Sequence, residues 1–122
     1  MNLSLHTNAI TGQILICFDE EGRRFWLDDM AAAIREQDHS FGLPDDGPTE
    51  SHLPGDGWTQ VEFYNIVCLA EPDAPLHIDN CVCSVIIEGG SAALSQLYEE
   101  IRALPQCITQ FELSKMGNGP QP

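Results

Sequence analysis

Five short segments with alternating apolar residues most strongly constrain the fold of this chain. A period of two places successive side chains on opposite faces and is typical of β-strands. One segment, 78–87, is apolar on both faces from Cys81 onward, which indicates a central strand that is covered on both sides. The alternation predicts strands over 10–18, 23–27, 58–70, 78–87 and 107–113.

Two other segments are predicted to be helices. Residues 30–37 are good helix formers, and Asp28 or Asp29 is expected to cap them by accepting free amide hydrogens. The second helix is predicted to begin after an N-cap at Ser91 and to end at Pro105. Its apolar residues follow the spacing i, i+3, i+4, i+7 and i+10, namely Leu94, Leu97, Tyr98, Ile101 and Leu104.

The order of these segments, ββαββαβ, predicts the fold class. Polar residues 19–22 are interpreted as the turn of a first hairpin, and hairpins imply antiparallel pairing. We therefore expect an α+β fold with a single layer of mainly antiparallel sheet and two helices packed on it. The length of 122 residues predicts one domain over 1–113, and residues 114–122 are predicted to form a flexible tail because they have little to bury.

Residues 40–57 differ from the rest of the chain in composition. They contain three of the eight prolines and four of the ten glycines, together with Asp45, Asp46, Glu50 and Asp56. Proline and glycine at this density interrupt both periodicities, so the segment is predicted to be a long acidic loop. A loop of this length in a compact domain is usually either functional or disordered, and both interpretations stay open.

The charge of the chain excludes several kinds of partner. Nineteen Asp and Glu residues and five Lys and Arg residues give a formal net charge of −14. Such a surface repels phosphates and anionic lipids, which argues against direct binding of nucleic acid or of a membrane surface. It favours encounter with a basic protein, although acidity also promotes solubility alone.

The cysteines and histidines indicate neither a cofactor nor a catalytic centre. The five cysteines are odd in number and lack C-x-x-C spacing, which predicts a reducing, cytoplasmic location. His77, Asp79, Cys81 and Cys83 share one face of a predicted strand, and all are zinc-ligand types. They would spread along more than about 15 Å of extended chain, so one straight strand cannot gather them around an ion. No catalytic motif occurs, and we expect no enzyme activity.

These features predict a non-enzymatic acidic binding protein that blocks a basic partner, such as a toxin, an effector or a nucleic-acid-binding enzyme. The chain is similar in size, charge and class to small acidic proteins that neutralise nuclease toxins as immunity proteins or inhibitors, or that mimic nucleic acid. The predicted partner-binding residues are carboxylates of the connecting segments, with two tryptophans as anchors. They are Asp19, Glu20, Glu21, Asp45, Asp46, Glu50, Asp56, Trp26 and Trp58.

Two alternatives remain from the sequence. The chain resembles dimeric type III secretion chaperones in its acidity and in the hairpin predicted over 18–27, but it lacks their N-terminal amphipathic helix. A metal-binding sensor or small enzyme that uses residues 77–83 is the second alternative. The oligomeric state is left open.

Overall fold

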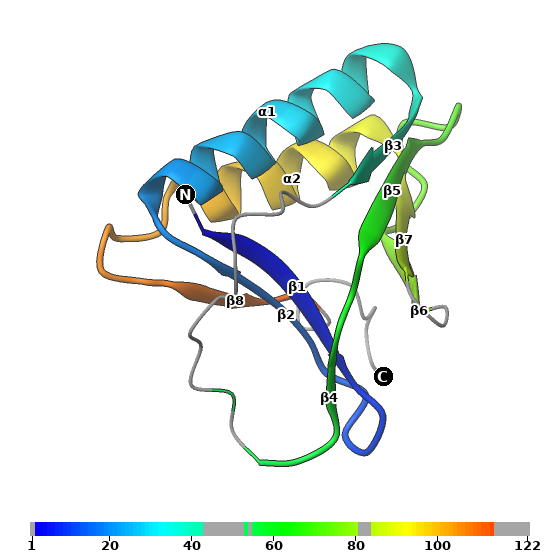
Figure 1. Cartoon of the computed structure of the whole chain (residues 1–122). Helices are drawn as coiled ribbons and strands as arrows, with labels where there is room; N and C mark the ends of the chain where they lie inside the picture. The colour runs from blue at the N-terminus through cyan, green and yellow to red at the C-terminus, as the bar shows by residue number, and fades with distance from the viewer. Residues whose placement is uncertain (1, 43–52, 54, 81–83, 114–122) are drawn as a thin grey trace.

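The computed structural model describes residues 2–42, 53, 55–80 and 84–113, with residues 38–42 described by their backbone. This part of the chain forms two helices and two four-stranded, mostly antiparallel sheets (Figure 1). The α+β class, with two helices and mainly antiparallel strands, is therefore confirmed. The strands divide between two sheets instead of forming one layer. The predicted site residues Asp45, Asp46 and Glu50 and the predicted tail 114–122 lie outside the described residues.

The first sheet, sheet A, is antiparallel throughout. Its two central strands form an N-terminal hairpin in which Leu5 lies opposite Ile16. This hairpin was not predicted from the sequence. The predicted strand over 10–18 begins only at Ile14, because Ile10 lies in the connecting turn and is 74% exposed. In spatial order, the strands are β4 (Trp58–Gln60), β1 (Leu3–Asn8), β2 (Ile14–Phe18) and β8 (Gln110–Glu112).

The second sheet, sheet B, contains one parallel pair, β5 with β7. The single strand predicted over 78–87 is wrong: its two ends form an antiparallel pair in which Ile78 lies opposite Ile87. The strand predicted over 58–70 divides between the two sheets, and the Val61 amide donates to the Leu5 carbonyl at 2.8 Å just after β4. In spatial order, the strands are β3 (Asp38–Gly42), β5 (Phe63–Cys68), β7 (Ser84–Gly89) and β6 (His77–Asn80).

Helix α1 (Glu20–Glu36) occupies the segment where a turn and a strand were predicted, so both predictions are wrong. Asp19 is its N-cap, and the Asp19 carboxylate accepts the Gly22 amide hydrogen at 2.8 Å. Asp28 and Asp29, the predicted caps, lie inside the helix. The buried side chains recur at helical spacing and form one face: Arg23, Trp26, Leu27, Met30 and Ala33.

Helix α2 (Ser91–Arg102) confirms the second predicted helix. Leu94, Leu97 and Ile101 are fully buried, as their spacing indicated. The N-cap is Gly90 instead of Ser91. Neither helix in the described part of the chain is long and apolar enough to cross a membrane.

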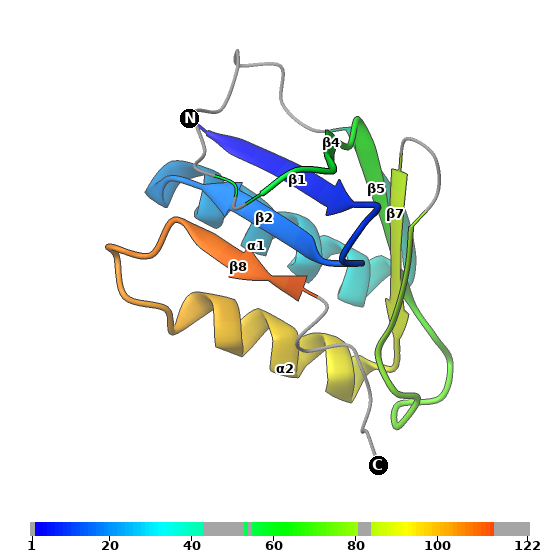
Figure 2. The same ribbon diagram turned by 90° about the horizontal axis from the view of Figure 1, so that it is seen from below.

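The two helices lie side by side and cover the inner faces of both sheets (Figures 1 and 2). Trp26 of α1 is at the centre of this core, with none of its surface exposed. Its ring lies 4.7 Å from the Tyr64 ring of β5, centroid to centroid, at an interplanar angle of 33°. The Tyr64 hydroxyl donates to the Asp29 carboxylate. Trp26 therefore holds α1 against sheet B and is not the exposed anchor that the sequence predicted.

Candidate functional site

The outer face of sheet B, which points away from the helices, is the candidate binding surface. Alternate residues of β5 and β7 are buried against the helices, so the residues between them project outward. No helix or strand in the described ranges covers this side (Figure 2). We define the outer face of sheet B by Phe63, Val67, Leu69, His77, Asp79, Ile86 and Glu88.

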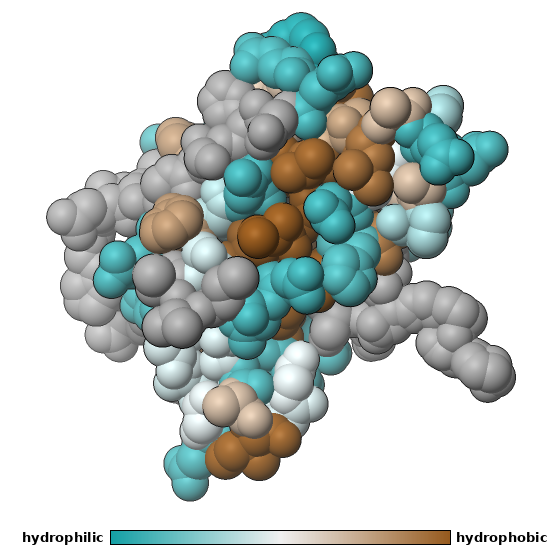
Figure 3. All heavy atoms as spheres, turned by 90° about the vertical axis from the view of Figure 1, so that its right-hand side faces the viewer, coloured by the Kyte–Doolittle hydropathy of each residue, from teal (hydrophilic) through white to brown (hydrophobic). Residues whose placement is uncertain are grey.

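The centre of the outer face of sheet B is apolar. Phe63 is 43% exposed and Leu69 is 37% exposed. Val67 and Ile86 are half-buried on the neighbouring strands β5 and β7. Figure 3 shows hydrophobic side chains gathered across the middle of this side of the molecule, between hydrophilic ones. Asn65 and Ser84 lie on the same face beside these residues, so apolar and polar side chains are mixed there, as they are in many protein-binding surfaces.

Polar and charged side chains lie beside these apolar residues on the edge strand β6 and on its neighbour β7. Asp79 lies opposite Ile86, and His77 lies opposite Glu88. His77 Nε2 is 3.3 Å from an Asp79 carboxylate oxygen, and both side chains are 62% exposed. A contact with this exposure contributes little to stability, so the fold does not depend on these two side chains. They are available to a partner.

Two residues of the predicted run 77–83, His77 and Asp79, contribute to this face. His77 and Asp79 lie on one face of β6, as the alternation indicated. Cys81 and Cys83 lie outside the described residues. Among the residues that the structure places, no group of three His, Cys, Asp or Glu side chains is arranged to hold a metal ion.

Two of the predicted site residues at the start of α1, Asp19 and Glu20, have roles within the fold. Burial raises the pKa of the Asp19 carboxyl, but hydrogen bonds from the backbone of Asn2 and Gly22 outweigh it and hold the pKa below its ordinary value. The Glu20 carboxylate pairs with the Arg23 guanidinium. Glu21 is exposed on the first turn of the same helix.

Asp56 and Trp58 lie at the opposite end of β1 from these residues. The Asp56 carbonyl accepts from the Asn8 side-chain amide at 3.0 Å, and Trp58 pairs with Asn8 in the sheet. The start of α1 instead adjoins Asn2, whose carbonyl accepts the Asp19 amide at 3.2 Å. A strand of six residues separates the two groups by about 17–20 Å. The described residues therefore do not unite the predicted carboxylates and tryptophans in one surface.

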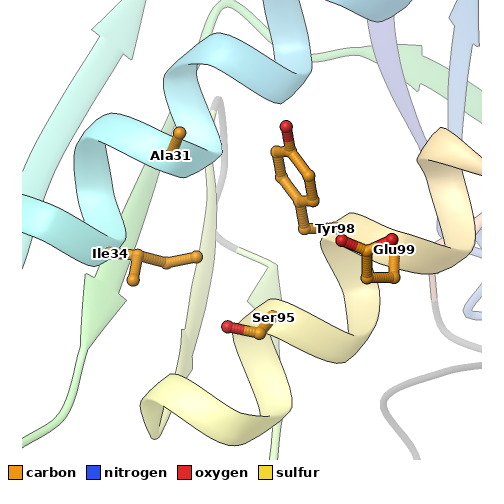
Figure 4. A pocket seen from close by; sticks show the side chains of 5 residues that line it. All are labelled: Ala31, Ile34, Ser95, Tyr98 and Glu99. Atoms are coloured by element: carbon orange, nitrogen blue, oxygen red, sulfur yellow. The ribbon is translucent and has the colours of Figure 1, made fainter.

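A small hollow lies between the two helices (Figure 4). Its volume is about 230 Å³, which is below the usual range of about 300–1,000 Å³ for small-molecule sites. The Ile34 side chain of α1 and the Ser95 side chain of α2 point toward one another across it, and the Tyr98 ring stands along one side. The hollow has room for one side chain, and we assign it no function of its own.

A buried serine–histidine contact in β1 was missed because the strand itself was missed. Ser4 Oγ lies 2.8 Å from His6 Nε2, a distance typical of a nucleophile and its base. Ser4 is completely buried and His6 is 6% exposed, so this pair is closed to substrate and satisfies the polar groups of β1. Burial lowers the pKa of His6.

This lowered pKa predicts how the stability of the protein depends on pH. Burial disfavours protonation of His6 in the folded state, whereas an unfolded histidine takes up a proton near its ordinary pKa of about 6.5. The contribution of His6 is complete above that pH and is lost as the pH falls toward the lowered folded pKa. Urea unfolding at pH 8 and pH 5.5 is expected to show a smaller loss of stability on acidification in His6→Gln than in the original chain. Equal losses would contradict this role.

Comparison of the chain with protein-family models, with curated proteins and with solved structures gives no match.

Proposed function

We propose that this protein binds and blocks a basic partner protein, without catalysis, through the outer face of sheet B. The observation that carries the proposal is the open sheet face itself, with an apolar centre and carboxylates at its border. The net charge of −14 supports a partner of opposite sign, because complementary potentials accelerate encounter and disfavour wrong partners.

The arrangement of this face determines what the partner must present. Binding energy is concentrated where an aromatic anchor becomes fully desolvated, and Phe63 is the exposed aromatic side chain of the apolar centre. Charges at the border contribute orientation and association rate more than affinity. The complementary surface is an apolar patch surrounded by lysine or arginine side chains that meet Asp79 and Glu88.

A second copy of this chain is a poor occupant of the same face. Self-association would bring the carboxylates of the two copies together, with a net charge of −14 on each chain. Like charges placed opposite one another at an interface cost several kcal/mol. The partner that binds this face is therefore a different, basic protein.

The secretion-chaperone alternative loses specific support. The hairpin over 18–27 that resembled secretion chaperones is not present, because residues 20–36 form α1. The metal-binding alternative stays a prediction, because Cys81 and Cys83 of the run 77–83 lie outside the described residues.

A photo-crosslinking amino acid in place of Phe63 tests the proposal in the native source. Phe25 of α1 is a matched control, because it is 40% exposed against 43% for Phe63 but lies on the helical side. We expect the probe at position 63 to capture a basic protein, and the probe at position 25 not to capture it. The double variant Asp79→Lys, Glu88→Lys is expected to weaken binding of the captured protein about tenfold or more, which is a loss of about 1.4 kcal/mol.

Three outcomes would contradict the proposal. The first is equal capture from both positions. The second is capture of another copy of this chain, which would favour the dimeric alternative. The third is binding that is indifferent to the charge reversal and to salt, because exposed ion pairs weaken as ionic strength rises.

A further inference from the structure

Arginine side chains gather in one hollow at the start of α1 and the end of α2. The hollow has a volume of about 400 Å³ and is open to solvent on the surface. The whole sequence contains five basic residues, and Arg23, Arg24 and Arg102 all line this hollow. Such a concentration of positive charge in a chain with nineteen acidic residues requires an explanation.

Arg23 supplies a fixed charge in the wall of the hollow. It is only 6% exposed, and its Nη1 donates to the carbonyls of Ile101 at 3.2 Å and Leu104 at 2.8 Å. Its Nη2 donates to Glu20. These bonds satisfy carbonyl groups at the end of α2, where a cation is also favoured by the helix dipole. Arg23 therefore links α1 to the end of α2, and these hydrogen bonds hold its guanidinium in place.

Arg24 has no comparable role within the fold. It is exposed and makes no ion pair or hydrogen bond with any residue that the structure describes. It follows Arg23 directly in the sequence, and it lies far from the C-terminal end of α1, where the helix dipole would favour a positive charge. An arginine without such a role, beside a fixed cation, is explained if an anion binds there.

Arg102 adds donors from the other side of the hollow. Its Nε and Nη2 donate to one carboxylate oxygen of Glu99 at 2.9 Å and 2.8 Å. Nη1 is not used in this pair, so it remains available to a ligand. With Glu20 and Glu99 as the paired carboxylates, three cations stand against two anions around the hollow. The side-chain amide of Gln106 also lines it.

We propose that this hollow binds a small molecule through an oxyanion group, a phosphate or a carboxylate, with Arg24 and Arg102 as ligands and Arg23 as the fixed charge. Guanidinium groups match the paired oxygens of both anions. The ligand is small because the net charge of −14 repels extended polyanions beyond the hollow. This site is independent of the proposed protein-binding function, since it lies on the helical side of the molecule and not on the outer face of sheet B.

Amide NMR titrations at low ionic strength test the site, with inorganic phosphate in one series and succinate in the other. We expect saturable shifts at Arg24, Arg102 and Gln106 with at least one of the two, and the tighter ligand identifies the preferred oxyanion. Arg24→Gln is expected to raise the dissociation constant about tenfold or more, because it removes charge-assisted hydrogen bonds. Arg102→Gln is expected to weaken binding in the same direction.

Arg35→Gln is the matched control. Arg35 lies on the same helix with its side chain 68% exposed, but it is outside the hollow and 3.8 Å from Glu36. This variant loses the same charge and is expected to keep the dissociation constant of the original chain. Absence of saturation with both anions would overturn the proposal. Equal weakening by Arg24→Gln and Arg35→Gln would also overturn it, since only the total charge would then matter.

Discussion

Replacement of Gly22 with alanine is expected to lower the free energy of unfolding by about 3 kcal/mol, the upper end of the usual cost of overpacking. In most helix interiors the same change stabilises a protein by about 1 kcal/mol. Here a Cβ on Gly22 would lie 1.7 Å from the carbonyl oxygen of Asn2 and 2.7 Å from its carbonyl carbon. Both atoms belong to backbone that leads directly into β1, so relief of the clash would displace that strand or the first turn of α1.

Urea unfolding followed by circular dichroism measures this loss. Gly12→Asn is the control, because Gly12 has a positive φ of 76°, which asparagine tolerates, and a Cβ there would meet no atom within 4 Å. We expect the control to change stability by less than about 1 kcal/mol. If Gly22→Ala were as stable as the original chain, the close packing of the N-terminal segment against α1 would be wrong.

Trp26→Ala is the second change with a large expected effect, a loss of about 3–5 kcal/mol. The side chain is completely buried and stacks on Tyr64, so its removal leaves a cavity between α1 and sheet B. A domain of this size is stable by only about 5–15 kcal/mol in total, and the variant is expected to be close to unfolding at room temperature. Thermal and urea unfolding both measure the change.

Two further substitutions, one at the exposed neighbour Phe25 and one that keeps an aromatic ring at position 26, serve as comparisons for Trp26→Ala. Phe25→Ala removes the adjacent, 40% exposed aromatic ring and is expected to cost less than about 1 kcal/mol. Trp26→Phe keeps an aromatic ring and removes an indole N–H that has no hydrogen-bond partner among the described residues, so it is expected to cost less than Trp26→Ala. Equal losses for Phe25→Ala and Trp26→Ala would contradict the central position of Trp26.

The two helices show why one was predictable and the other only in part. The buried face of α2 consists of the apolar residues Leu94, Leu97 and Ile101, so its helical period can be read from the sequence. In α1, Phe25 and Leu27 alternate as in a strand, whereas the buried stripe passes through Arg23 and Trp26. An arginine at a core position hides the helical period, because its burial depends on carbonyl partners at the distant end of α2. Sequence spacing alone does not reveal those partners.

No local feature of the sequence indicates that the strands divide between two sheets. The chain passes from β4 to β5 through Val61 and Glu62, without proline or glycine. Likewise, 81–83 between β6 and β7 consists of cysteine and valine, with no typical turn residue. The pairing of these strands is determined by tertiary packing, so both segments were predicted as single strands.

The candidate surface was only partly predictable. The alternation correctly placed His77 and Asp79 on one face of a strand. Ile86 belongs to the segment 78–87, which is predicted to be covered on both sides because it is apolar on both faces. Val67 and Ile86 are partly exposed because both helices pack on the opposite face of sheet B, and the sequence does not indicate which face the helices cover. The carboxylates predicted to bind a partner belong to connecting segments, whereas Asp79 and Glu88 lie within strands.

The strand order of sheet A has a consequence for biosynthesis. The hairpin of β1 and β2 leaves the ribosome before β4 and β8, which complete its two lateral edges, and Cys17 pairs with Gln110. Closing such distant pairs is slow, because the entropy of a long intervening loop is lost before the contacts form. Until then, both edges of a buried, apolar hairpin can pair with other chains. The nascent polypeptide therefore passes through an interval in which shielding by a chaperone would raise the yield of native molecules.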